Sequence, residues 1–163
     1  MSIEQQLPPP APGRQRLAFA ADHAGYELKD HLVELATKAG YDVLDLGVND
    51  ATSVDYPDFA GAAARTVAAG DADCGVVVCG TGIGVSMAAN KVPGVRAAVV
   101  HDVFTAHYSR EHNDANVLCL GARVIGYGVA ETALAEFLAT AFGEGRHTGR
   151  VAKIMSIEGA PDE

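Results

Sequence analysis

A thiol stands directly before a glycine-rich turn in the run CGTGIG, residues 79–84. An apolar run from Cys74 precedes it and a helix-like segment follows, so the turn is predicted to join a buried strand to a helix. Glycines let successive backbone N–H groups point at one spot, where the start of a helix adds positive potential. Such a turn can hold a phosphate or stabilise an oxyanion. A plain tight turn explains it equally well, because the GxGxxG spacing and the Lys-Ser/Thr of a P-loop are both missing.

Cys79 lies where the predicted strand meets the predicted helix, so its thiol is expected to face the crevice beyond the sheet. Backbone N–H dipoles at that point favour the thiolate, which is a base and a nucleophile. The other interpretation is a buried structural thiol, and we adopt it for Cys74 and Cys119. For Cys79 we favour a functional role.

Histidines and one carboxylate are further candidates for proton transfer. Asp22 and His23 follow a short apolar run. They could form an acid–base or phosphate-binding pair, or Asp22 could merely cap the helix that follows. His101, His107 and His112 share one segment, and histidine titrates near neutral pH, although a solvated helix position is the default for each. The nearby acids show no established ligand spacing, so we expect no metal site.

Three arginines could form a phosphate clamp. Arg146 and Arg150 are four residues apart and would share one face of a helix, and Arg123 could join them. However, Gly145 and Gly149 weaken the helical interpretation. By spacing alone, a solvated basic tail is therefore favoured.

Short apolar runs that alternate with helical patterns must position these residues. Strands are expected at residues 17–21, 41–46, 74–79, 95–100 and 117–120, and helices at 26–39, 57–69, 85–91, 101–111 and 127–142. Uniformly apolar strands separated by helices are typical of a parallel sheet covered on both faces. We therefore predict an α/β protein with three α/β/α layers and a Rossmann-like five-stranded parallel sheet in a single domain.

Ligands of such sheets bind beyond the carboxyl ends of the strands. That rule selects Asp22-His23, Asp55-Tyr56, residues 79–84 and His101-Asp102. It does not select His112-Asn113, which precedes the fifth strand and needs another explanation.

Length and composition narrow the classes of protein. A chain of 163 residues fits one domain, and a net charge of −9 argues against a general nucleic-acid or anionic-membrane binder. Apolar runs stay below the ~18 residues of a membrane span. Three cysteines without a CxxC motif, and no basic-then-apolar start, indicate a cytoplasmic protein. We expect a disordered proline-rich leader at residues 1–14, the domain at 15–158 and a flexible C-terminus at 159–163.

Seven motifs occur together in this chain: DHAG at 22–25, DYP at 55–57, CGTGIG at 79–84, AANK at 88–91, HNDAN at 112–116, GARVIG at 121–126 and GRH at 145–147. In this order, over residues 17–157, they resemble the type B ribose-5-phosphate isomerases, which are related to the galactose-6-phosphate isomerase subunits. The resemblance implies interconversion of ribose 5-phosphate and ribulose 5-phosphate without metal or cofactor.

The resemblance also implies residue roles. Cys79 matches the base that moves a proton between C2 and C1, and Val85 stands where other members carry a glutamate. His112 matches the residue that opens the sugar ring, with Asp22 assisting. Thr81 and the amides of Gly80, Gly82, Ile83 and Gly84 match the oxyanion pocket. The family's phosphate-binding residues are matched by His23, Arg123, Arg146 and Arg150. Its sugar-binding residues are matched by Tyr56 and Asn113.

Members of that family are dimers or pairs of dimers with sites built from two subunits. A site shared between two subunits would explain how His112 and Asn113 reach a substrate. A C-terminal tail or helix is expected to contact the partner subunit. Two alternatives remain: an isomerase of six-carbon phosphosugars such as allose 6-phosphate or galactose 6-phosphate, and a non-catalytic phosphosugar- or nucleotide-binding module. The module would need the phosphate clamp but not Cys79 and His112 together.

Overall fold

The computed structural model describes residues 7–159 of the chain. Within them, strands and helices alternate as the sequence predicts. The strands are β1 (Arg16–Ala21), β2 (Asp42–Asp45), β3 (Cys74–Cys79), β4 (Ala97–Val99) and β5 (Val117–Gly121). The helices are α1 (Tyr26–Lys38), α2 (Tyr56–Ala68), α3 (Ile83–Ala89), α4 (Val103–Glu111), α5 (Tyr127–Ala139) and α6 (Arg146–Ser156).

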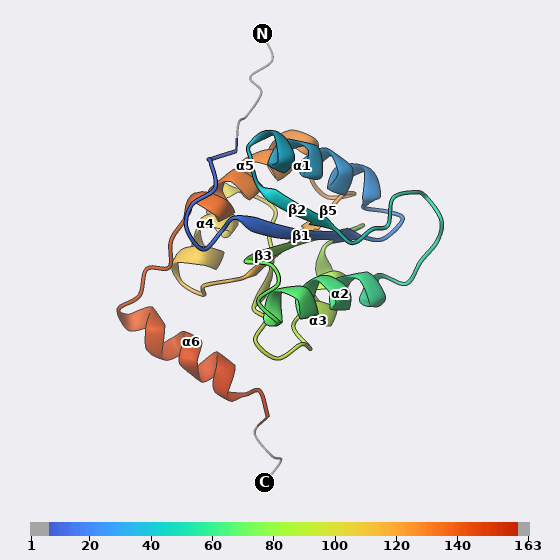
Figure 1. Cartoon of the computed structure of the whole chain (residues 1–163). Helices are drawn as coiled ribbons and strands as arrows, with labels where there is room; N and C mark the ends of the chain where they lie inside the picture. The colour runs from blue at the N-terminus through green and yellow to red at the C-terminus, as the bar shows by residue number, and fades with distance from the viewer. Residues whose placement is uncertain (1–6, 160–163) are drawn as a thin grey trace.

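The five strands form one parallel sheet in the order β2-β1-β3-β5-β4. The chain steps from β1 to β2 on one side and then crosses to β3 on the other, so the winding direction changes between β1 and β3. Ligands of open parallel sheets bind beyond the strand ends at such a point. We call the side of the sheet at which Ala21, Cys79 and Gly121 end their strands the carboxyl edge, and it lies at the right of Figure 1.

Helices cover both faces of the sheet, which confirms the predicted three-layer α/β/α class. In Figure 1, α1 and α5 lie above the sheet, and α2 and α3 lie below it. Because side chains alternate along a strand, Val78 packs in the core under α1, α4 and α5, whereas Cys79 packs in the core on the other face. That second core is filled from α2 by the small side chains of Ala60, Ala63 and Ala64.

The outer edge of β4 is closed by a side chain. Asn90 follows α3, and its Nδ2 donates to the carbonyl oxygen of Ala97 at 2.9 Å. Its Oδ1 accepts from the N–H of Ala97 at 2.8 Å. The Asn90 amide therefore makes both hydrogen bonds that a neighbouring strand would make to this residue.

The segment before β1 is packed against the domain. Leu7 is buried in the core under α1 and α5, and the Tyr41 hydroxyl donates to the carbonyl oxygen of Pro8 at 2.8 Å. Nη1 of Arg14 donates to the carbonyl oxygen of Leu138 at 2.7 Å. For residues 7–14 this corrects the expectation of a disordered leader, because a proline lacks an N–H but keeps a carbonyl that accepts. The rest of the expected leader, residues 1–6, and residues 160–163 of the expected C-terminus lie outside the described residues.

The basic segment that spacing favoured as a solvated tail is the helix α6. It begins after Gly145, which has a φ of 56°, and continues through Gly149. None of the residues of α6, all of which the structure describes, is buried. Figure 1 shows the helix at the lower left, projecting away from the sheet. It contacts the domain near its two ends, where His147 stacks on His112 and Met155 meets Arg96. No helix within residues 7–159 is long and apolar enough to cross a membrane.

A side chain at Gly121 would collide with the turn that follows β3. Its Cβ would lie 2.6 Å from the carbonyl carbon of Thr81 and 2.7 Å from the carbonyl oxygen. Gly121→Ala should therefore lower the free energy of unfolding by about 1–3 kcal/mol, measured as a lower urea midpoint. Gly128→Ala is the control, since a Cβ there would meet no described atom within 4 Å. An unchanged midpoint for Gly121→Ala would mean that the turn is free to move.

Candidate active site

The thiol of Cys79 lies at the carboxyl edge, at the start of the glycine-rich turn. The residue is 5% exposed, and its Sγ accepts a hydrogen bond from the N–H of Gly82 at 3.1 Å. Gly82 has a φ of 78°, a left-handed conformation that glycine adopts without strain. The turn therefore folds back so that a backbone donor points at the sulfur.

The other two thiols lie inside the sheet. Burial raises the pKa of Cys119, and the nearby Cys79 adds to this effect. Burial also raises the pKa of Cys74, against the opposing influence of Arg110 and Arg14. Both therefore stay protonated at neutral pH, as structural thiols do.

The turn after Cys79 is covered by a tyrosine at the start of α2. Thr81 is exposed, and its Oγ1 accepts from the N–H of Ile83 at 3.2 Å. A Cβ on Gly84 would lie 2.7 Å from the ring of Tyr56, so only glycine allows this ring to lie over the turn. Tyr56 is itself 40% exposed. A phenol therefore lies beside Gly84, and a threonine hydroxyl is bonded to the N–H of Ile83 in the same turn.

A buried lysine fixes the loop that leads to Tyr56. Lys29 is fully buried, and its Nζ donates to both carboxylate oxygens of Asp45, at 2.7 and 2.8 Å, and to Oδ1 of Asn49 at 2.7 Å. The same loop brings the N–H of Val54 to within 3.3 Å of Nδ1 of His23. This bond assigns the ring proton of neutral His23 to Nε2, which is then a donor.

Asp22 closes the turn after β1. Its Oδ1 accepts from the N–H of Ala24 at 2.9 Å and of Gly25 at 3.1 Å, and the residue is 7% exposed. The interpretation of Asp22 as a capping residue is thus partly right: it satisfies N–H groups of the turn, while Gly25 is the N-cap of α1. Its Oδ2 makes no hydrogen bond within residues 7–159.

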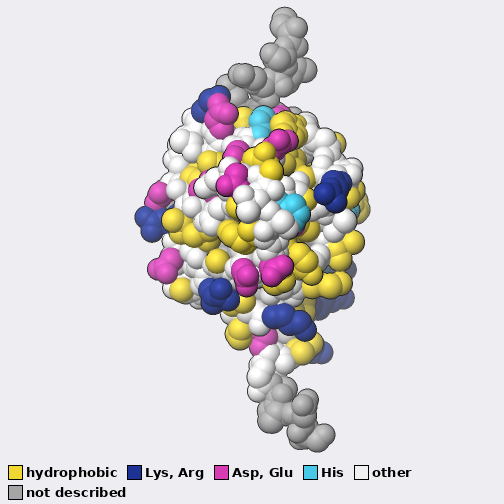
Figure 2. Space-filling view, turned by 90° about the vertical axis from the view of Figure 1, so that its right-hand side faces the viewer, with side chains coloured by type: hydrophobic (Ala, Val, Ile, Leu, Met, Phe, Trp, Pro, Cys, Tyr) yellow, Lys and Arg dark blue, Asp and Glu magenta, His cyan; other side chains and the backbone are white. Residues whose placement is uncertain are grey.

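An arginine completes this group. The N–H of Arg123 donates to the carbonyl oxygen of Gly80 at 3.0 Å, and the Cδ atom of Arg123 lies 3.5 Å from where a Cβ of Gly80 would be. Figure 2 views the molecule from the side of the carboxyl edge and shows basic, acidic and hydrophobic side chains interspersed there. We call the residues of this edge the carboxyl-edge group: Asp22, His23, Tyr56, Cys79, Gly80, Thr81, Gly82, Ile83, Gly84 and Arg123.

The remaining expected site residues lie elsewhere, near the C-terminal end of α4. His112 ends that helix, and its Nε2 is 3.3 Å from Oε2 of Glu111. The imidazole stacks on that of His147 in α6, with 4.1 Å between ring centroids and 12° between planes. We call His112, Asn113, Arg146, His147 and Arg150 the α4–α6 group.

The two groups lie at opposite ends of the sheet. Gly121 pairs with Cys79, whereas His112 precedes Val117 at the other end of β5. At ~3.3 Å per residue, the rise from Val117 to Gly121 alone is roughly 13 Å. One chain therefore cannot bring His112 and Cys79 to the same small substrate in this arrangement.

His147 was not among the site residues expected from the sequence, although it belongs to the GRH motif. Partial desolvation, followed by the positive charges of His112, Arg146 and Arg150, lowers the pKa of His147. His147 becomes a candidate because its ring stacks on that of His112, a contact that is seen only in the folded chain. The GRH motif at residues 145–147 was the signal that could have found it.

Two other candidates from the sequence, Asp102 and His101, belong to neither group. Asp102 caps α4, since its Oδ1 accepts from the N–H of Thr105 at 2.7 Å. His101 has a buried Nδ1 that finds no hydrogen-bond partner within residues 7–159. In the same range, no group of three or more His, Cys, Asp and Glu side chains could hold a metal ion.

The sequence profile described as "Ribose/Galactose Isomerase" matches residues 17–154. The chain belongs to this family. It is 41% identical over 144 residues to ribose-5-phosphate isomerase B of Escherichia coli, covering 88% of this chain and 97% of that protein. Membership of the ribose/galactose isomerase family makes the chain an enzyme, so the non-catalytic binding module is discarded.

Solved structures of the ribose/galactose isomerase family share this fold. The ribose-5-phosphate isomerase B of Clostridium thermocellum has a TM-score of 0.87 and 48% identity, covering 88% of this chain and 97% of that one. The ribose-5-phosphate isomerase B of Mycoplasma genitalium was solved with bound ribulose 5-phosphate. It has a TM-score of 0.84 and 42% identity, and the match covers 88% of this chain and 95% of that one. The resemblance seen in the motifs is therefore confirmed.

Proposed function

We propose that this chain interconverts ribose 5-phosphate and ribulose 5-phosphate through an enediolate. The observation that carries the proposal is the thiol of Cys79, which accepts a hydrogen bond from the backbone N–H of Gly82 in the glycine-rich turn. An aldose–ketose isomerase needs a base next to C1 and C2 and donors for the oxygen that becomes charged. The names of the E. coli and C. thermocellum relatives support this pair of substrates.

Proton transfer is assigned to the carboxyl-edge group. The thiolate of Cys79 takes the proton from C2 of the open-chain aldose, the C1–C2 double bond forms, and the negative charge moves to O1. Thr81 and the N–H groups of residues 80–84 stabilise that oxyanion. The proton then returns from Cys79 to C1, and the proton of O2 passes to O1 as the ketone forms at C2.

Ring opening is assigned to the α4–α6 group. His112 takes the proton from the hydroxyl on C1 of the furanose and passes it to the ring oxygen as the C1–O bond to that oxygen breaks. Asp22 assists this transfer from the carboxyl edge. His23 and Arg123 bind the phosphate from one group, and Arg146 and Arg150 bind it from the other, while Tyr56 and Asn113 contact the sugar.

These assignments require a second copy of the chain. Because the two groups lie at opposite ends of one sheet, each complete site would take the carboxyl-edge group from one subunit and the α4–α6 group from its partner. Apolar side chains stand exposed on the surfaces that would meet: Met87 of α3 is 62% exposed, Phe104 of α4 69%, and Ile157 beyond α6 77%. A surface of this kind is typical of an interface.

The preferred substrate distinguishes this proposal from the six-carbon alternative. The family description covers both ribose and galactose isomerases. Purified protein is given ribose 5-phosphate, allose 6-phosphate or galactose 6-phosphate, with and without a chelator, and formation of each ketose is followed. The proposal expects the highest kcat/KM for ribose 5-phosphate, unchanged by chelation. A higher kcat/KM for either six-carbon substrate would establish the alternative.

Loss of one arginine from α6 should weaken phosphate binding. A charge-assisted hydrogen bond contributes ~1.5–3 kcal/mol, so Arg146→Gln or Arg150→Gln should raise KM by roughly one to two powers of ten. The thiol is unaffected, so kcat should change much less. Lys153→Gln, an exposed basic residue in the last turn of the same helix, is the control. Equal KM values for all three variants would contradict the clamp.

A further inference from the structure

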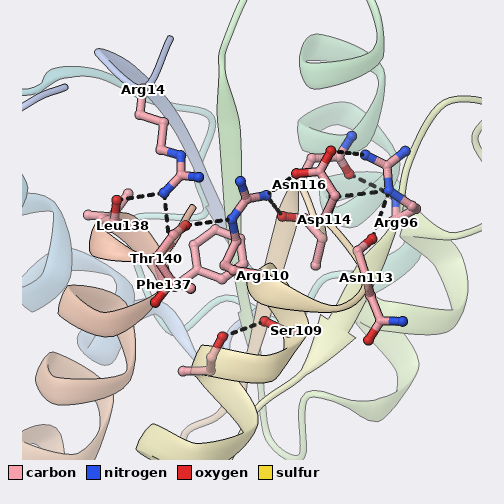
Figure 3. A network of polar contacts seen from close by, with 12 residues as sticks. Arg14, Arg96, Ser109, Arg110, Asn113, Asp114, Asn116, Phe137, Leu138 and Thr140 are labelled. Carbon is pink, nitrogen blue, oxygen red and sulfur yellow. Dashed lines mark hydrogen bonds and ion pairs between the residues drawn. The ribbon is translucent and has the colours of Figure 1, made fainter. Parts of the chain in front are cut away.

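The loop between α4 and β5 turns sharply at Asp114. Its φ is 46°, in the left-handed region that residues other than glycine rarely adopt. Its carboxylate lies between two arginines, with Oδ1 3.0 Å from Nη1 of Arg110 and Oδ2 3.3 Å from Nη2 of Arg96. Figure 3 shows the two guanidinium groups on opposite sides of the loop. We call Asp114, Arg96 and Arg110 the Asp114 clamp.

The same two arginines also hold the backbone of the loop. Nε of Arg96 donates to the carbonyl oxygens of Asn113, at 3.1 Å, and Asp114, at 2.9 Å. Nη1 of Arg110 donates to the carbonyl oxygen of Ala115. Three successive carbonyls are therefore bonded to guanidinium groups, which leaves this part of the loop little freedom.

The clamp is anchored in the rest of the domain. Arg110 is 6% exposed, its guanidinium carbon lies 5.4 Å from the centre of the Phe137 ring, and its Nε donates to the carbonyl oxygen of Thr140 at 3.4 Å. Arg96 reaches α6, since its Nη1 is 3.2 Å from Sδ of Met155. A buried arginine needs a charged partner, and Asp114 provides it.

We propose that Asp114 is a positioning residue for His112 and Asn113. Both precede it directly. Asn113 is exposed, and the imidazole of His112 contacts His147, Tyr108 and Glu111 while its backbone leads into the clamped loop. The clamp fixes the backbone from which they project and, through Arg96, fixes it relative to α6. It thereby presents the α4–α6 group in one geometry. This inference rests on the proposed function, because it assigns His112 to ring opening.

Asp114→Asn tests the proposal with little change in shape. Asparagine tolerates the left-handed conformation, so the substitution removes the charge that both arginines contact and leaves the backbone unstrained. Since misplacing a catalytic group by 1 Å can cost ~10²-fold, we expect kcat for ribose 5-phosphate to fall about tenfold. Solvent exchange of the C1 proton of ribulose 5-phosphate, which needs no ring opening, should fall less than about threefold. Added to His112→Ala, the change should cause no further loss.

A second readout does not depend on activity. The imidazole of His112 stacks on His147, so its proton NMR signals, identified by their loss in His112→Ala, report the geometry of the loop. Asp114→Asn should shift these signals. If the wild-type protein isomerises no ribose 5-phosphate, the proposed function fails and the NMR readout still decides the role of Asp114.

Asp42→Asn is the matched control, because Asp42 also pairs with an arginine, Arg16 at 2.6 Å, but on the exposed strand β2. It should change neither kcat nor the His112 signals. Arg96→Lys is the second variant; it keeps the charge but loses the two carbonyl contacts of Nε, and it should reproduce the pattern if Asp114→Asn does not fold. The proposal is overturned if a folded variant leaves the His112 signals unmoved, or if proton exchange falls as much as turnover.

Discussion

Cys79→Ala should fold and lose nearly all isomerase activity. General-base catalysis contributes ~10²–10⁴-fold, so kcat should fall by about three powers of ten, and solvent exchange of the C1 proton of ribulose 5-phosphate should fall with it. The thiol is a small side chain at the end of β3, so its removal leaves the apolar residues of the core in place. Steady-state kinetics and NMR exchange measure the two losses.

The other two cysteines are the controls for this result. Cys74→Ala and Cys119→Ala remove thiols that lie inside the sheet, away from the glycine-rich turn. Each should lower thermal stability and keep kcat close to that of the wild-type protein. A folded Cys79→Ala protein with near-wild-type turnover would refute the assignment of the base.

Two inactive variants should restore activity when their subunits mix. A dimer of one Cys79→Ala chain and one His112→Ala chain has one site with both residues intact and one with both missing. Each mixed dimer should therefore reach about half of wild-type activity if the sites are shared between copies in a symmetric dimer. The measurement is ribose 5-phosphate turnover after the two proteins are unfolded and refolded together, compared with each refolded alone.

Differently tagged subunits provide the control for exchange, because co-purification of both tags proves that mixed dimers formed. Mixed dimers without recovered activity would place Cys79 and His112 in the site of one chain. The separation of the two groups along β5 would then have to close by a large movement of α4 and α6, since the strand itself cannot shorten.

Local patterns explain how much of this structure was predictable. The apolar run of β3 predicted a buried strand, and its abrupt end at Gly80 predicted where the thiol emerges. The motifs predicted the family, and the match over residues 17–154 confirms it. Propensity failed at α6, where Gly149 argues against a helix that tertiary contacts at both ends maintain. It also failed at residues 7–14, where prolines suggested disorder and Leu7 instead fills part of the core.

Long-range order could not be predicted from these patterns. Nothing in the apolar runs says that β5 enters between β3 and β4, although this order places Gly121 beside Cys79. The stack of His112 on His147 joins residues that are 35 positions apart. The Asp114 clamp likewise depends on how α4, β4 and α6 pack together. Residue spacing along the chain does not predict that packing.

The amide of Asn90 has a consequence for how copies of this chain can associate. An unprotected edge strand is a template on which another chain can add a strand, and repeated addition leads to fibres. Asn90 already occupies the donor and the acceptor of Ala97, so an incoming strand would first have to displace it. Growth of the sheet from one molecule to the next is thereby opposed at β4.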